Sequence, residues 1–192
     1  MSKNNEFWNK QYARKPHFAK SFRASPLARR FVAELKKDKL KGVRILDVGM
    51  GNGRDSRFFA RRNFIPTGID IVPKAVKMAE SLSTQYGITF ENMNVENLTY
   101  DDNFFGGVYS IGVLHSTNIS KSFKEIKRVL KSRGLFMAMM FLRDKNNIES
   151  RTFLSDVALE IENLKFNVLD LYVITKKERG DDHDSVIFLV QK

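Results

Sequence analysis

Short apolar runs alternate with amphipathic stretches along most of the chain. Runs rich in Val, Ile, Leu and Phe predict five strands, at 43–48, 65–70, 88–94, 107–112 and 135–142. Apolar residues recur with a helical period around them, which predicts helices that begin at Pro26 and Pro73 and helices over 54–62 and 121–131. Nearly continuous apolar strands that alternate with helices are typical of a mostly parallel sheet covered on both faces, so the pattern predicts a doubly wound, Rossmann-like α/β fold.

The last part of the chain breaks this alternation. A helical pattern over 153–164 is followed by two strand patterns, 166–174 and 186–190, which are joined by the polar, glycine-containing stretch 175–185. Two strands in succession with a polar connection predict an antiparallel hairpin. The expected sheet therefore has seven strands and is mostly parallel, with a C-terminal antiparallel hairpin.

Composition is consistent with one globular domain over 1–192. The chain has 192 residues, of which 42% are hydrophobic, and no linker or internal repeat divides it. We expect an N-terminal helical arm or lid (1–40), a ligand-binding core (41–142) and a C-terminal helix and hairpin (143–192). The absence of cysteine excludes disulfides and cysteine nucleophiles, and no apolar run approaches a membrane span of about 18 residues. A cytoplasmic protein is expected.

The net charge of +11 has two interpretations, a nucleic-acid partner or a solvated basic surface. Clustered Lys and Arg bind nucleic acid because they displace counterions from phosphates. Basic residues of the predicted helix over 121–131 instead alternate with apolar ones, which favours a solvated basic surface. A nucleic-acid partner is therefore the less favoured interpretation.

The run Val43–Val48 leads into a turn with three alternating glycines, Gly49, Gly51 and Gly53. Glycine at such a turn lets the backbone approach a ligand where a Cβ atom would collide. Polar side chains stand near the ends of the first three predicted strands, namely Asp47, Asp70 and Asn94. In an open parallel sheet, ligands bind beyond the carboxyl ends of the strands, so a ligand site across these three strand ends follows.

The spacing of the glycines indicates which ligand binds there. A dinucleotide fingerprint is G-x-G-x-x-G, but Arg54 occupies the position of its third glycine, and the chain has D-x-G-x-G-x-G instead. An acid at Asp47 would repel a pyrophosphate at the helix N-terminus. A cationic ligand without phosphate suits the turn better, and S-adenosylmethionine (SAM) is such a ligand.

With this turn, the chain resembles class I SAM-dependent methyltransferases over nearly its whole length. Four further segments resemble motifs of the family, at 67–71, 96–105, 110–115 and 126–134. Within the family, the segments 53–56 and 8–12 are similar to small-molecule methyltransferases of the tellurite-resistance and thiopurine type.

The resemblance implies a set of cofactor-binding residues. Asp47 would accept a hydrogen bond from the ammonium of SAM through water, and Asp70 would accept from both ribose hydroxyls. The glycines would run against the methionine moiety, whereas residues after the third and fourth strands would lie by the adenine and the methionine end. The complete set is Asp47, Gly49, Gly51, Gly53, Asp70, Ile71, Asn94, Val95, Ser110 and Ile111.

The methyl acceptor is less evident from the sequence. His115 is either a general base, for which an imidazole pKa near neutrality is suited, or a residue that only shapes the pocket. Phe7, Trp8 and Tyr12 either cap the acceptor pocket or pack in the ordinary way. No spacing of His, Asp and Glu resembles a metal site.

Missing motifs narrow the acceptor class. The fourth strand carries Ser110-Ile111-Gly112-Val113 in place of the Asn/Asp-Pro-Pro-Tyr/Phe motif that holds a planar amine in adenine and glutamine methyltransferases. The leading hypothesis is therefore a methyltransferase that acts on an O, N or S atom of a small molecule, as a monomer or homodimer. Two alternatives stay open: an RNA methyltransferase, and a SAM-binding protein without transfer activity.

Overall fold

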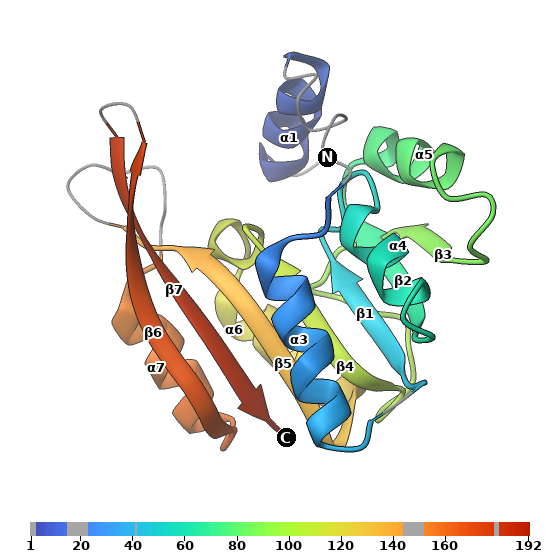
Figure 1. The fold of residues 1–192 in the computed structure, drawn as a ribbon. Helices are drawn as coiled ribbons and strands as arrows, with labels where there is room; N and C mark the ends of the chain where they lie inside the picture. The colour runs from blue at the N-terminus through green and yellow to red at the C-terminus, as the bar shows by residue number, and fades with distance from the viewer. Residues whose placement is uncertain (1–2, 15–22, 41, 144–151, 179–180) are drawn as a thin grey trace.

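The computed structural model describes residues 3–14, 23–40, 42–143, 152–178 and 181–192 (Figure 1). Within these residues, seven strands form one sheet in the order β3-β2-β1-β4-β5-β7-β6. The first five strands run parallel, and β7 pairs antiparallel with both β5 and β6. The bounds are β1 Arg44–Val48, β2 Ile65–Asp70, β3 Thr89–Asn92, β4 Phe105–Ile111, β5 Leu130–Phe141, β6 Asn167–Glu178 and β7 Asp181–Gln191. The predicted doubly wound topology is confirmed.

Helices cover both faces of the sheet (Figure 1). On one face lie α3 (Pro26–Lys37), α4 (Arg54–Ala60) and α5 (Pro73–Ser81), and on the other lie α6 (Ile119–Val129) and α7 (Leu154–Asn163). A short helix, α1 (Lys3–Arg14), lies above the end of β1 and next to α5. None of the described helices combines the length and the apolar character that crossing a bilayer requires.

The helix α3 shows how local sequence determines these elements. Ser25 caps it, because its hydroxyl accepts a hydrogen bond from the N–H of Ala28 at 2.9 Å, and Pro26 occupies the first helical position. The predicted apolar face is buried at Phe31, Val32 and Leu35. These side chains pack on the sheet, where Tyr109 of β4 stacks on Phe31 with 5.6 Å between ring centroids.

The predicted connection 175–185 is wrong, because the strands of the hairpin continue through most of it. The ladder between β6 and β7 extends to the pair Glu178–Asp181. Thr175 pairs with Asp184, and its hydroxyl donates to the Asp184 carboxylate at 2.6 Å. Backbone hydrogen bonds hold an antiparallel ladder, so polar residues continue it at a sheet edge where no apolar pattern marks the strand.

Other strand boundaries also differ from the prediction, and β4 begins at Phe105 rather than at residue 107. β3 ends at Asn92 rather than Asn94, and β5 begins at Leu130, five residues before the predicted start. The predicted helix over 121–131 accordingly ends at Val129 as α6. Strand pairing decides these ends, and the apolar pattern of a single segment does not reveal its partner.

Candidate functional site

The glycine turn follows β1, and each of its three glycines has a positive φ, namely 68° at Gly49, 59° at Gly51 and 72° at Gly53. A Cβ atom on Gly49 would lie 2.2 Å from a methyl carbon of Val113 in the loop after β4. A Cβ atom on Gly53 would lie 3.0 Å from the ring of Phe90. Gly49 and Gly53 therefore allow close packing within the protein, whereas a Cβ atom on Gly51 would meet the hydroxyl of Tyr12 at 3.0 Å.

Asp70 joins the turn after β1 to the turn after β2. One carboxylate oxygen accepts a hydrogen bond from the N–H of Gly51 at 3.1 Å, and the other accepts from the N–H of Val72 at 2.9 Å. Burial raises the pKa of Asp70 to about 6, and the backbone N–H donors partly oppose that rise. The ionised carboxylate is thus buried with little to stabilise its charge. A ligand that donates hydrogen bonds would stabilise this ionised form.

Asp47 is a second buried carboxylate beside the same turn. It is 3% exposed and accepts a hydrogen bond from the Ser56 hydroxyl at 2.5 Å. Burial, and secondarily the neighbouring Asp55, raises the pKa of Asp47 to about 7. The sequence prediction that acids gather at the ends of β1 and β2 is confirmed, because these strands pair in register with Asp47 opposite Gly68.

Asp55 is a residue that sequence reasoning missed. One of its carboxylate oxygens accepts from the N–H of Ser25 at 2.9 Å, and the carboxylate pairs with Arg54 at 2.9 Å. It therefore fixes the start of α3 against the first turn of α4. An acid in the first turn of the helix after a glycine turn was the available signal, since acids are favoured at helix N-termini.

The N-terminal arm brings Tyr12, but not Phe7, to the glycine turn. The Tyr12 hydroxyl lies over Gly51, and burial and then the charge of Asp70 raise the pKa of Tyr12. Phe7 is 45% exposed and packs edge-on against Trp8, with 5.3 Å between ring centroids. Tyr12 therefore lies against a cofactor-binding candidate, Gly51.

The two predicted residues at the end of β4, Ser110 and Ile111, differ in burial. Ser110 is fully buried, and its hydroxyl donates to the carbonyl oxygen of Val48 at 3.4 Å, so its side chain links β4 to β1. Ile111 is partly buried at the end of the strand.

His115 lies in the one-turn helix η1 (Leu114–Ser116), with its ring edge-on to Phe141 at 4.8 Å between centroids. Its Nδ1 atom is buried and has no hydrogen-bond partner among the described residues. Burial lowers the pKa of His115 to about 4. The imidazole is therefore neutral at physiological pH.

The predicted residues after β3 lie beyond the strand end. Asn94 is exposed, and its side-chain oxygen accepts from the N–H of Glu96 at 3.0 Å, whereas Val95 is buried in the core. The amide at the true end of β3 is Asn92, whose Nδ2 donates to the Asp70 carbonyl oxygen at 2.8 Å. Sequence reasoning missed Asn92 because it placed the strand end two residues too late.

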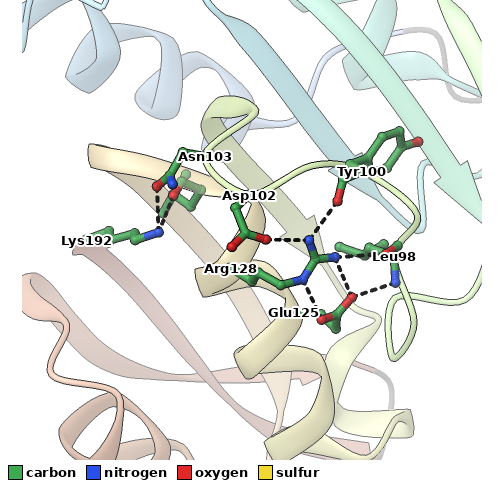
Figure 2. Close-up of polar contacts among 8 residues, drawn as sticks. Leu98, Tyr100, Asp102, Asn103, Glu125, Arg128 and Lys192 are labelled. Atoms are coloured by element: carbon green, nitrogen blue, oxygen red, sulfur yellow. Dashed lines mark hydrogen bonds and ion pairs between the residues drawn. The ribbon is translucent and has the colours of Figure 1, made fainter.

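One arginine of α6 holds the segment that follows Val95 (Figure 2). The guanidinium of Arg128 donates to the carbonyl oxygens of Leu98 and Tyr100, at 2.8 and 2.7 Å. It also pairs with Asp102 at 2.9 Å and with Glu125 at 2.8 Å. Glu125 in turn accepts from the N–H of Leu98 at 2.8 Å. The side chains of α6 therefore bind the backbone of this segment and pair with the charge of its Asp102.

Together these residues favour one kind of ligand. Asp47 and Asp70 place two buried carboxylates beside a glycine turn whose middle glycine, Gly51, is covered by the hydroxyl of Tyr12. Such a donor-poor, acidic environment fits hydroxyl and ammonium groups and disfavours phosphate. Within the described part of the chain, no group of three or more His, Asp or Glu side chains is arranged to hold a metal ion.

Comparison with known proteins identifies relatives of the core. A family described as "Methyltransferase domain" matches residues 46–138, about half of the chain. A sterol 24-C-methyltransferase of Gibberella zeae is 29% identical over 128 residues, which are 62% of this chain and 34% of that protein. A ubiquinone/menaquinone biosynthesis C-methyltransferase of Hydrogenovibrio crunogenus is 35% identical over 116 residues, 54% of this chain and 45% of that protein. The chain thus aligns with less than half the length of these curated relatives.

A solved structure matches the whole fold. The 1,6-didemethyltoxoflavin-N1-methyltransferase of Burkholderia thailandensis, with its substrate and S-adenosylhomocysteine bound, superposes with a TM-score of 0.72. The match covers 100% of this chain and 91% of that one at 17% sequence identity. At this identity the likeness demonstrates the fold alone.

Proposed function

The chain belongs to the class I SAM-dependent methyltransferases, and from this premise we propose that it transfers a methyl group from SAM to a small-molecule acceptor. The observation that carries the proposal is the pair of buried carboxylates, Asp47 and Asp70, on either side of the glycine turn. In a chain of net charge +11, a site with two buried acids selects a cationic, hydrogen-bond-donating ligand. SAM combines a sulfonium, an ammonium and two ribose hydroxyls.

We propose the following roles in cofactor binding. The two oxygens of Asp70 accept backbone N–H groups of Gly51 and Val72, and we propose that they also accept the two ribose hydroxyls. Asp47 receives the ammonium through water, and the backbone of Gly51 runs against the methionine moiety. The predicted residues Ile71, Asn94, Val95, Ser110 and Ile111 complete the site around the adenine and the methionine end.

The chemistry then depends mainly on positioning. SAM supplies a methyl group that its sulfonium already makes electrophilic. The protein aligns the acceptor with this group and excludes water, which supplies a large part of the acceleration in such transfers. We propose that α1, with Tyr12 over Gly51, is the lid that closes the cofactor side.

We propose that His115 shapes the acceptor pocket rather than acting as the general base. A pKa of about 4 keeps its imidazole unprotonated, but it also makes the imidazole a weak acceptor of protons at neutral pH. Its edge-on contact with Phe141 is a packing contact. The buried Nδ1 then serves as a hydrogen-bonding group toward the acceptor.

The names of the curated relatives add carbon to the acceptor atoms that should be tested. Both relatives are described as C-methyltransferases, one of a sterol and one in quinone biosynthesis. An acceptor screen should therefore include molecules with a nucleophilic carbon besides those with O, N or S nucleophiles. Formation of S-adenosylhomocysteine is the readout, and turnover of any acceptor excludes a SAM-binding protein without transfer activity.

Calorimetry with SAM tests the cofactor assignment. Replacing Asp70 by Asn keeps the shape of the side chain but removes its charge and one acceptor oxygen, so the affinity for SAM should fall about 10- to 100-fold. Asp70→Ala should lower the affinity more than His115→Ala does, because on our proposal Asp70 contacts SAM directly and His115 does not. Normal affinity in both Asp70 variants, with the fold intact by circular dichroism, would contradict the assignment.

A further inference from the structure

Two adjoining hollows lie between α3 and α4 on the outer face of the protein. The first, of about 280 Å³, is lined by Arg23, Ala24, Arg29, Phe58, Arg61 and Arg62. The second, of about 330 Å³, is lined by Lys36, Gly42, Arg62, Asn63 and Phe64. Arg62 lines both, so the hollows adjoin, and we name the pair the α3–α4 groove.

The positive charge of the α3–α4 groove is not neutralised by neighbouring acids. Its five cations are exposed and form no ion pair with any described residue, namely Arg23, Arg29, Lys36, Arg61 and Arg62. The nearby acids have other partners. Glu34 pairs with Lys37 at 2.9 Å, and Asp38 accepts a hydrogen bond from Gln191 at 3.1 Å.

Three arginines of the groove contact aromatic rings. The guanidinium carbons of Arg29 and Arg62 lie 5.6 and 5.2 Å from the ring centroid of Phe58, and that of Arg61 lies 5.8 Å from the ring centroid of Tyr86. These cation–π contacts orient planar guanidiniums, whose donors match phosphate oxygens in a bidentate manner. The arginine side chains of the lining are thus suited to bind phosphate groups.

The shape and lining of the groove distinguish between classes of polyanion. A surface that docks on a bilayer presents exposed apolar side chains for insertion next to its basic residues. Here Phe58 and Phe64 are only 6% and 5% exposed, and no large exposed hydrophobic residue is in the lining. Consecutive concave hollows instead suit a flexible chain whose phosphates recur along the groove.

We propose that the α3–α4 groove binds the phosphate backbone of a single-stranded nucleic acid. The site is separate from the cofactor-binding turn, although one end of the groove, at Arg23, lies two residues from Ser25, which contacts Asp55. Binding follows from the five exposed cations, because each phosphate that they neutralise releases counterions. The proposal does not depend on methyl transfer, so its test uses no SAM turnover.

Fluorescence anisotropy with a labelled oligouridine of about 16 nucleotides tests this site. For single strands the slope of log K against log salt is about −0.7 per phosphate contact, so five contacts give a slope of up to about −3.5. In the double variant Arg61→Gln/Arg62→Gln, two contacts are lost. The slope should become less negative by about 1.4, and affinity at about 50 mM salt should fall at least about tenfold.

The double variant Lys121→Gln/Lys124→Gln is the matched control. It removes the same charge from exposed positions of α6 on the other face, and it should leave both affinity and slope nearly unchanged. Equal losses in the two variants would overturn the proposal, because they would show a diffuse charge effect. Binding to anionic lipid vesicles without binding to oligouridine or oligothymidine would also overturn it.

Discussion

The three glycines of the turn have different neighbours, although they share a positive φ. Gly49 faces Val113 and Gly53 faces Phe90, and both neighbours belong to the packed interior. Gly51 faces the hydroxyl end of Tyr12, a residue of α1. The same residue type therefore serves packing at two positions and, on our proposal, ligand access at the third.

Alanine substitutions should separate these roles. Gly49→Ala combines left-handed strain of about 1–2 kcal/mol with a steric clash against Val113, so it should lower stability in urea by clearly more than Gly51→Ala. Gly51→Ala carries similar strain but displaces only Tyr12, and it should weaken SAM binding in calorimetry. The assignment of roles fails if Gly51→Ala binds SAM normally while Gly49→Ala is as stable as Gly51→Ala.

At the scale of elements, α6 carries the segment 97–103 as well as covering the sheet. Arg128 binds two carbonyl oxygens of the segment, and Glu125 binds one of its N–H groups (Figure 2). The C-terminal Lys192 adds a contact from the sheet, since its ammonium donates to Asn103 at 2.9 Å. A long connection without secondary structure thereby has a fixed path between β3 and β4.

Arg128→Gln should release this segment from α6. Two backbone carbonyls lose a charged donor, so the free energy of unfolding should fall by about 1–2 kcal/mol, reduced from the buried limit because the Arg128 side chain is 31% exposed. Hydrogen exchange should increase at the N–H of Leu98, whose acceptor Glu125 loses its partner. Lys124→Gln, an exposed change on the same helix, is the control, and equal exchange in both variants would refute the role of Arg128.

At the scale of the whole molecule, a basic surface surrounds an acidic interior site. Asp47 and Asp70 have pKa values raised by burial to about 7 and about 6, so the folded protein holds their protons above the pH at which the unfolded chain releases them. The folded-state pKa of His115 is lowered to about 4, which has the opposite effect on stability. The two acids give the folded state two more bound protons than the unfolded state, and His115 gives it one fewer. The folded state therefore binds one more proton in total.

Stability of the ligand-free protein should therefore fall as the pH rises from about 4.5 to about 6, by up to about 1.4 kcal/mol per pH unit, and should fall further toward pH 7 as Asp47 ionises. Thermal unfolding across this range measures the effect, and Asp70→Asn should flatten it. SAM favours the ionised carboxylates, so its stabilisation should be greater at pH 7.5 than at pH 5.5. A Tm of the free protein that rises steadily over the window would contradict these pKa shifts.

Sequence patterns determined the order of strands and helices and the residues of the glycine turn. β2 has the predicted bounds, Ile65–Asp70, and α3 begins with the predicted cap at Ser25. These features depend on short-range physics, namely the period of apolar residues, capping and the φ angles that glycine permits. The positions of Asp47 and Asp70 at neighbouring strand ends follow from the same local reasoning.

Only the tertiary structure decided which residues, distant in the sequence, contact one another. The contact of Asp55 with Ser25 joins residues 30 positions apart, and Tyr12 meets Gly51 only because α1 lies over β1. The continuation of β6 and β7 through 175–185 depends on a partner strand rather than on an apolar pattern. Basic residues that look scattered along the sequence gather in the α3–α4 groove, because charge density at a surface depends on which helices lie side by side.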